Sequence, residues 1–147
     1  MFDAHRETAE ACELQLRQYG GVASFAGRVA TVRCFEDNVL LERALTEPGD
    51  GRVLVVDAGG SYRCALLGGR IAGLARDNGW AGLVVNGCVR DVEALAALPV
   101  GIKALGSCPR PSGKTGAGEL EVPVSFGNAT FAPGAVVHSD ADGIVVV

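Results

Sequence analysis

The stretch "AGLVVNGCVRDVEALAALPVGIKAL" (residues 81–105) holds two buried-strand patterns with one helical pattern between them. Residues 83–85 are continuously apolar, which is typical of a strand covered on both faces. A helical pattern runs from Asp91 to Leu98 and ends before Pro99, because proline cannot continue a helix. Residues 101–105 then predict a second strand. The order strand, helix, strand predicts two parallel strands joined by a crossover helix.

Two further elements of the same kind precede this stretch. Residues 53–56 form another continuous apolar run, and Gly59-Gly60 turns the chain after it. A helix is predicted from about Gly69, and Asn78-Gly79 supplies its C-terminal stop. Together with the opening stretch, these elements predict a parallel βαβαβ core.

The flanking segments complete the predicted fold. Upstream, we expect a helix over residues 5–19 and a strand over residues 22–35. A short helix follows, capped by Asp37 and running to Leu45. After Cys108 the chain changes to short strands separated by turn dipeptides, which predict antiparallel hairpins. These dipeptides are Gly127-Asn128, Pro133-Gly134 and Asp142-Gly143.

The composition favours one compact α/β domain over residues 1–147, because a chain of this length can bury a sizeable core. Thirteen basic against 17 acidic residues give a net charge of −4. Nucleic acid is therefore not an expected partner, since its binding depends on a basic surface. No apolar run is long enough to predict a membrane span. Five cysteines without a C-x-x-C motif are typical of reduced thiols in a cytoplasmic protein.

The segment Gly113-Lys114-Thr115 looks like the end of a phosphate-binding loop. Such a loop needs a glycine five residues before Gly113, and Cys108 stands there instead. A nucleotide site is therefore not predicted, and we interpret the segment as a mobile polar loop.

The segment "HSDADG" (residues 138–143) could suggest a metal cluster of His138, Asp140 and Asp142. Aspartate is also favoured in turns, because its side chain bonds nearby backbone amides. We therefore predict a turn. Cys88 could be a nucleophile by its position after a strand, but no histidine lies in a recognisable partner motif. A small buried side chain is the favoured interpretation.

The Arg90-Asp91 pair allows two interpretations. In the first, Asp91 caps the helix that follows it, with Glu93 favourable in the first turn. In the second, the pair belongs to a ligand-binding site, because it follows a strand and ligands of parallel sheets bind beyond the carboxyl ends of the strands. Residues 68–71 also lie there, at the start of the preceding helix, whose free amides can hold a carboxylate. A cationic fork, a carboxylate and free amides suit a small keto acid with a divalent metal.

Four segments of the chain together resemble one known family. They are "CFEDN" (residues 34–38), "GDGRVLVVDAGGSYRCALLGG" (49–69), "NGWAGLVVNGCVRDVEAL" (78–95) and "VPVSFGNATFAPGAVVHSDADGIVV" (122–146). In combination they strongly resemble the RraA-like family. That family includes class II 4-hydroxy-4-methyl-2-oxoglutarate aldolases, proteins formerly called demethylmenaquinone methyltransferases, and regulators of ribonuclease E.

The resemblance implies a swivelling β/β/α fold and a ring-shaped homotrimer with sites between subunits. It implies that the loop over residues 109–119 of one subunit lies near the Arg90 of another. It also implies lyase activity that depends on Mg²⁺ or Mn²⁺. The family's aldolase signature is a glycine about twenty residues before Arg-Asp, and 20 residues separate Gly69 from Arg90 here. By position, the implied substrate-binding residues are Gly68, Gly69, Arg70, Ile71 and Arg90, the implied metal ligand is Asp91, and the implied catalytic residues are Arg90 and Asp91.

The reaction expected from this resemblance splits 4-hydroxy-4-methyl-2-oxoglutarate into two pyruvates, with oxaloacetate decarboxylation as a side activity. The general base is open between Glu36, Asp3 and a metal-bound water. Some family aldolases add a metal-site glutamate from a C-terminal extension past the position of Val147. The alternative is a non-catalytic, protein-binding regulator of ribonuclease E. That branch lacks the aspartate of the Arg-Asp pair, and Asp91 is present here. A methyltransferase is disfavoured because no glycine-rich nucleotide loop is present.

Overall fold

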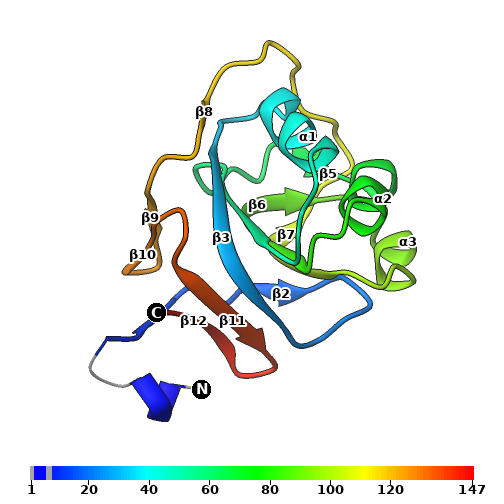
Figure 1. The fold of residues 1–147 in the computed structure, drawn as a ribbon. Coiled ribbons are helices and arrows are strands. Elements are labelled where there is room, and N and C mark those ends of the chain that lie inside the picture. Colours follow the sequence, from blue (N-terminus) through cyan, green and yellow to red (C-terminus); the bar gives the residue numbers. More distant parts are fainter. Residues whose placement is uncertain (1, 6–7) are drawn as a thin grey trace.

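Four parallel strands form the centre of the sheet (Figure 1). The structure is a computed structural model and describes residues 2–5 and 8–147. In spatial order the strands are β3 (Phe25–Arg33), β4 (Val53–Asp57), β6 (Gly82–Val89) and β7 (Gly101–Ser107). The chain passes from β4 through β5 (Ala65–Leu67) and α2 (Gly69–Asp77) to β6, and then through α3 (Val92–Ala96) to β7. The predicted parallel βαβαβ core is therefore confirmed.

The long strand β3 joins this parallel core to the C-terminal strands. Its second half pairs in parallel with β4, and its first half pairs antiparallel with β11 (Val136–Asp140). Strand β12 (Gly143–Val146) continues the sheet from β11. A separate hairpin consists of β9 (Val124–Phe126) and β10 (Ala129–Phe131). Two of the predicted C-terminal hairpins are confirmed, with left-handed residues in the turns at Gly127-Asn128 and at Gly143. The turn at Pro133-Gly134 instead joins β10 to β11, which belong to different sheets.

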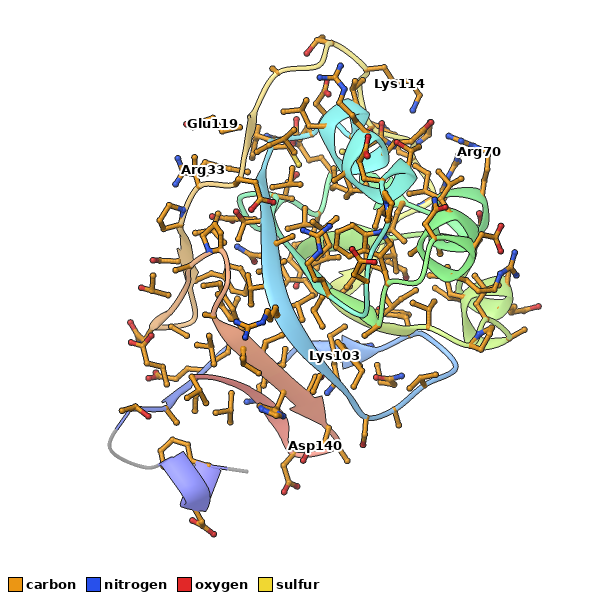
Figure 2. The ribbon with its side chains drawn as sticks, in the orientation of Figure 1. Arg33, Arg70, Lys103, Lys114, Glu119 and Asp140 are labelled. Atoms are coloured by element: carbon orange, nitrogen blue, oxygen red, sulfur yellow. The ribbon has the colours of Figure 1, made fainter. Side chains whose placement is uncertain are left out.

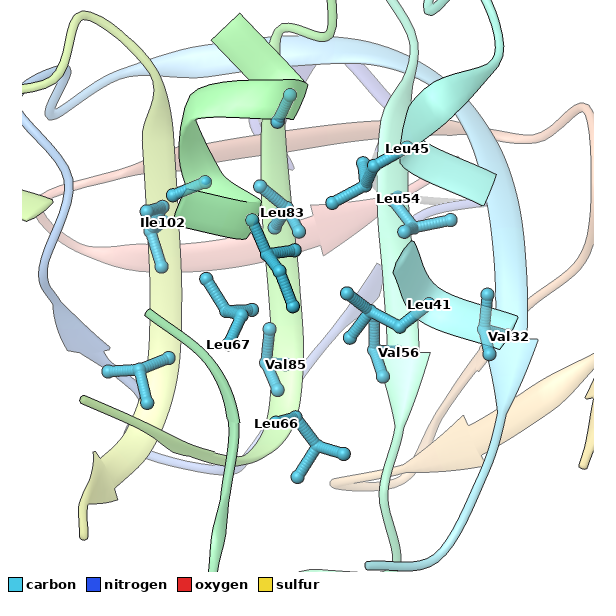
Figure 3. Packing of buried hydrophobic residues seen from close by; sticks show 14 of the residues in the cluster. Val32, Leu41, Leu45, Leu54, Val56, Leu66, Leu67, Leu83, Val85 and Ile102 are labelled. Atoms are coloured by element: carbon cyan, nitrogen blue, oxygen red, sulfur yellow. The ribbon is translucent and has the colours of Figure 1, made fainter. Parts of the chain in front are cut away.

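One face of the sheet is covered by helices. Leu54 and Val56 of β4 point to this face and belong to one buried cluster with Leu41 and Leu45 of α1 (Val39–Thr46) (Figure 3). Full burial of one such side chain contributes about 1.5–3 kcal/mol. This layer fixes where α1 and α2 begin, and therefore where the backbone amides of the α2 N-terminus lie.

The opposite face is covered by the C-terminal strands. Val53 and Val55 alternate with the helix-facing residues of β4 and belong to a second buried cluster. Phe126 and Phe131 of the β9–β10 hairpin lie in the same cluster, with their ring centroids 4.8 Å apart. The continuous apolar run of β4 in the sequence is explained by these two layers.

The helix predicted over residues 5–19 is wrong. The chain there forms a short 3-10 helix η1 (Phe2–His5) and two strands, β1 (Glu10–Ala11) and β2 (Arg17–Gln18), while residues 6 and 7 lie outside the described part. Strand β1 pairs with β12 and β2 pairs with β7, so both complete edges of the sheet. Pairing with distant strands outweighs the local helical preference, which is a weak signal.

Two other predicted helices differ at their ends. α1 begins after Asn38, and Asp37 contributes by accepting the amide hydrogen of Val39. α3 is shorter than the predicted range from Asp91 to Leu98. A further short strand, β8 (Glu119–Leu120), pairs with β3 and had no sequence signal. In the described residues, no helix is both long and apolar enough to cross a membrane.

Candidate functional site

A cavity of about 270 Å³ opens beyond the carboxyl ends of β5 and β6, next to the start of α2. Five of the six residues predicted for the site line it together, and the sixth, Gly69, adjoins it through a hydrogen bond to Asp91. The lining comprises Asn38, Ala65, Leu66, Leu67, Gly68, Arg70, Ile71, Arg90, Asp91, Pro111, Ser112 and Lys114. The structure therefore brings together two segments, residues 68–71 and 90–91, that are separated in the sequence.

Asp91 caps a different helix from the one expected. It precedes α3 in a left-handed conformation (φ 59°, ψ 45°), and its side chain makes no capping bond to α3. Its Oδ2 instead accepts a hydrogen bond of 2.9 Å from the backbone amide of Gly69, the first residue of α2. The local capping interpretation is therefore wrong. A carboxylate at this end of α2 is favoured by the free amides and by the helix dipole.

Gly68 makes this contact possible. A Cβ on Gly68 would collide with Oδ2 of Asp91 and would lie 3.1 Å from Cγ of Arg90. Only glycine leaves room for both side chains at the start of α2. The Gly-Gly pair in the sequence thus reflects a close approach of the Asp91 carboxylate to the backbone.

Arg90 is exposed at the mouth of the cavity. Its backbone amide donates to the carbonyl of Leu67 at 2.9 Å, which fixes the chain at the end of β6. Among the described residues, no carboxylate lies within ion-pair distance of its guanidinium, Asp91 included. The fork of Arg90 is therefore available to an anion from solution.

The first turn of α2 adds unpaired backbone donors. Ala72 is the first residue whose amide bonds back along the chain, to the carbonyl of Gly68. The amides of Arg70 and Ile71 have no partner inside the helix, as expected at a helix N-terminus. The guanidinium of Arg70 is engaged elsewhere, because it donates to Glu42 at 2.6 Å and so lowers the pKa of that carboxyl group. At this position the backbone, and not the side chain, is free to bind.

Three polar residues of the cavity, Asn38, Ser112 and Lys114, were missed by the sequence reasoning. The Nζ of Lys114 donates to Oδ1 of Asn38 at 3.0 Å. Asn38 is buried and donates from Nδ2 to the carbonyl of Leu66 at 2.9 Å. Figure 2 shows Lys114 on the same side of the molecule as Arg70. The only sequence signals were the motif "CFEDN" and the lysine of the Gly-Lys-Thr segment.

The Gly-Lys-Thr segment is hydrogen-bonded to a buried carboxylate at its C-terminal end. The buried carboxylate of Asp37 accepts hydrogen bonds from the amide and hydroxyl of Thr115 and from the amide of Gly116. Burial alone would raise the pKa of Asp37, but the bonds from Thr115, Val39 and Gly116 outweigh it and lower the pKa. The backbone of Gly113 also bonds to that of Glu36.

Neither protein candidate for the general base lines this cavity in the same chain. Glu36 accepts hydrogen bonds from Ser61 at 2.7 Å and from Arg63 at 2.5 Å. These bonds lower the pKa of Glu36 and make it a weaker base. Asp3 lines a separate cavity of about 260 Å³ together with His138.

Two alternative sites weighed in the sequence resolve into structural roles. Cys88 is fully buried, and burial raises the pKa of its thiol, which confirms it as a packing residue. The amide of Asp142 donates to Oδ1 of Asp140 at 2.9 Å, which confirms the turn. Across the described chain, no three His, Cys, Asp or Glu side chains come together in a way that could hold a metal ion.

Comparison with known proteins gives a consistent family and differing names. The family model RraA-like: Aldolase/RraA matches residues 2–146. A Geobacillus kaustophilus HTA426 structure described as an S-adenosylmethionine:2-dimethylmenaquinone methyltransferase is 46% identical, with a TM-score of 0.98 over 99% of this chain and 91% of that one. The RNA-processing inhibitor RraA of Thermus thermophilis is 45% identical, with a TM-score of 0.96 over 99% and 88%. Streptomyces coelicolor RraAS2, of the RNase ES inhibitor RraA family, is 29% identical, with a TM-score of 0.76 over 93% and 71%.

Proposed function

The chain belongs to the RraA-like family, and on that premise we propose that it is a divalent-metal-dependent carbon–carbon lyase. The proposed reaction splits 4-hydroxy-4-methyl-2-oxoglutarate into two pyruvates. Oxaloacetate decarboxylation is the expected side activity, because it passes through the same pyruvate enolate. One observation carries the proposal: the carboxylate of Asp91 and the unpaired fork of Arg90 line one cavity at the N-terminus of α2.

The donor set fits a cation that keeps much of its water. Asp91 supplies the carboxylate of the cavity lining, and only its Oδ2 accepts a hydrogen bond within the described residues. Mg²⁺ commonly binds through one or two carboxylates and retains several waters. Asp91 would therefore be the residue whose carboxylate holds Mg²⁺ or Mn²⁺. When bound, the cation would supply a Lewis acid that polarises the keto group of the substrate.

The residues of the chain itself have two tasks in this reaction. The guanidinium of Arg90 can hold a carboxylate, or the developing enolate, through two parallel N–H donors. The free amides of Arg70 and Ile71 can hold a second anionic oxygen at the helix N-terminus. Removal of the C4 hydroxyl proton starts the bond cleavage, and Glu36, Asp3 and a metal-bound water all remain candidates for the base.

We further propose that the protein acts as a cytoplasmic homotrimer. Phe35 and Tyr62 support this, because their aromatic side chains are 56% and 62% exposed on the surface of one chain. Within one chain, Pro111, Ser112 and Lys114 already reach the cavity. The loop over residues 109–119 would therefore contribute to the cavity of its own subunit in addition to any neighbour. Light scattering should report three chains per particle at micromolar concentration, and a monomer would contradict this assembly.

A second candidate function is regulation of ribonuclease E by direct protein binding. The observation in its favour is the name of the Thermus structure, an RNA-processing inhibitor that is 45% identical to this chain. Cleavage of an RNA substrate by ribonuclease E, with and without the protein, tests it. Inhibition that survives Asp91→Ala would assign the regulatory activity to a surface independent of the proposed lyase site.

The lyase proposal is tested by coupled measurement of pyruvate release. The wild-type protein should release pyruvate from 4-hydroxy-4-methyl-2-oxoglutarate and, more slowly, from oxaloacetate. EDTA should abolish both activities, and added Mg²⁺ or Mn²⁺ should restore them. Full activity in excess chelator would overturn the role of the metal, and no pyruvate release with either cation would overturn the lyase.

A further inference from the structure

We propose that the small cavity beside Lys103 binds a monovalent anion of the size of chloride. This site shares no lining residue with the cavity at the start of α2, so the inference does not rest on the proposed function. The small cavity lies between Lys103 of β7, the link from β1 to β2, and the turn between β11 and β12. Figure 2 shows Lys103 and Asp140 on the side of the molecule away from Arg70 and Lys114.

Lys103 places an ammonium group inside the fold without an ion-pair partner. The residue is 4% exposed, and among the described residues no carboxylate lies within ion-pair distance of its Nζ. Its one hydrogen bond in this part of the chain goes to the carbonyl oxygen of Asp140, at 2.6 Å. An ammonium group has three donors, so two remain. A buried charge is costly unless an opposite charge compensates it, and the described chain supplies none at contact distance.

The cavity offers space next to this ammonium group. Its volume is about 60 Å³, against about 270 Å³ for the cavity at the start of α2. One water needs roughly 10–15 Å³ of such space, so the cavity suits an ion of one or a few atoms. Lys103 is the only cation among the described residues of the lining, and the one carboxylate there belongs to Asp142, an exposed residue. Water screens an exposed charge, which limits the repulsion between Asp142 and an anion at Nζ.

A second buried polar group at this corner also lacks a partner. The Oγ of Ser139 is the one buried side-chain oxygen or nitrogen in the described chain that makes no hydrogen bond. Ser139 is 3% exposed and directly precedes Asp140, and it pairs with Ile144, which lines the cavity. Buried polar groups without a protein partner are uncommon and indicate a bound water or ion. This observation is independent of Lys103 and indicates a polar occupant at the same corner.

An anion in this cavity would act where the two ends of the sheet meet. Strands β3, β4 and β6 stand between β7 and β11 in the sheet, yet the bond from Lys103 to Asp140 joins β7 directly to the end of β11. Burial lowers the pKa of Lys103, and attraction by the carboxylate of Asp140 offsets this only in part. An anion that accepts the two free donors would compensate the remaining cost of the charge. It would therefore stabilise this contact between the two ends of the sheet.

Thermal unfolding of the whole chain at pH 7 tests the site, with sodium chloride, sodium bromide and sodium gluconate compared at equal ionic strength. Gluconate carries the same charge but is too large for the cavity, so it reports the general effect of salt. Chloride and bromide should stabilise the wild type in a saturable manner. At a halide concentration ten times the dissociation constant, the folding equilibrium constant should rise about elevenfold. Lys103→Met should lose this saturable effect and keep the general response to salt.

Lys114→Gln is the matched control, because Lys114 is the only other lysine of the sequence and lies at the cavity at the start of α2. It should keep the saturable halide effect. An effect that Lys114→Gln loses and Lys103→Met keeps would place the anion at that other cavity and overturn the inference. Equal effects of halide and gluconate on the wild type would also overturn it.

If Lys103→Met does not fold, crystals of the wild type soaked in bromide decide the question by anomalous scattering. A bromide peak in contact with Nζ of Lys103 is the expected result. Waters alone at that position would overturn the inference.

Discussion

Two corners of the molecule each carry an aspartate whose carboxylate accepts a backbone amide, but the amides lie at very different distances along the chain. At the β11–β12 corner, Oδ1 of Asp140 accepts the amide of Asp142, two residues away. At the β6–α3 corner, the side chain of Asp91 makes no capping bond to α3, the helix that follows it. Its Oδ2 accepts the amide of Gly69, 22 residues earlier. The first carboxylate is used by its own turn. The second carboxylate links the end of β6 to the start of α2, beside the cavity that both line.

The same distinction separates the anchored loop from ordinary turns. The carboxylate of Asp37 also bonds across a long stretch of sequence, to Thr115 and Gly116. The carboxylates of Asp37 and Asp91 both bond to distant backbone amides, and both lie at the carboxyl edge of the parallel sheet, where the candidate site is. For these three aspartates, the position of the bonded partner, and not the local motif, separates the turn at Asp140 from the residues that shape the site.

The largest expected difference is between Asp91→Ala and Asp140→Ala. Loss of Asp91 should reduce pyruvate release by more than about 10²-fold, the scale of losing one group that stabilises developing charge. It should cost only about 0.5–2 kcal/mol of stability, the value of a helix cap. Asp140→Ala should keep full activity and lose about 0.5–1.5 kcal/mol with one hydrogen bond. Kinetics and urea unfolding measure both. Equal pyruvate release by the two variants would contradict the different roles of Asp91 and Asp140.

A pair of glycine substitutions sharpens the comparison inside α2. Gly68→Ala places a methyl group against the Asp91 carboxylate and should cost about 1–3 kcal/mol of stability together with most of the activity. Gly73→Ala, in the same helix, meets only Arg76 at 3.6 Å and should gain about 0.5–1 kcal/mol. Thermal unfolding and pyruvate release separate the two. A harmless Gly68→Ala would show that the close approach of Asp91 is not needed.

Acid titration tests the anchor at Asp37. Because the pKa of Asp37 is lowered in the folded protein from its ordinary 3.8, its stabilising effect is complete above that pH. The effect is lost as the pH falls through the folded value. Urea unfolding between pH 3 and pH 7 should therefore show an acid-dependent loss of stability that is reduced in Asp37→Asn. Identical pH profiles would remove Asp37 as the anchor.

The smallest effect is expected in the half of the molecule covered by strands. Lys103 is 4% exposed and donates to the carbonyl of Asp140 (Figure 2). Burial lowers its pKa in the folded state, so the unfolded chain binds the proton more strongly. Stability should then rise with pH through the range between the folded value and 10.5. Lys103→Met should flatten this rise and, at pH 7, stay within about 1 kcal/mol of the wild type, because loss of a buried charge offsets the lost bond. Pyruvate release by Lys103→Met should equal that of the wild type. A strong loss would show that the strand-covered half of the molecule affects the candidate site.

Much of the fold followed from the sequence. The apolar runs at residues 53–56 and 83–85 are buried on both faces, so local hydrophobicity and tertiary position agree. The N-terminal segment failed because β1 and β2 are only two residues long. Their conformation is set by the strands they pair with, and no local pattern encodes that.

The candidate site was predictable in part. Arg90, Asp91 and residues 68–71 came from their positions and from the resemblance, and the structure places them around one cavity. Asn38 and Lys114 could not be predicted, because their contact joins residues 76 positions apart. Local motifs also gave Asp91 the wrong helix to cap, since both helices begin close to it in space.

In the proposed mechanism Arg90 and Asp91 carry the bond cleavage, and the substitution Arg90→Lys is the sharpest test of it. Lysine keeps the charge but loses the paired donors of the planar fork. Pyruvate release from 4-hydroxy-4-methyl-2-oxoglutarate and from oxaloacetate is measured with Mg²⁺ for the wild type and Arg90→Lys. We expect a steep loss of rate on both substrates, with kcat falling more than KM rises. Near-wild-type rates on both would remove Arg90 from the mechanism and contradict the proposed site.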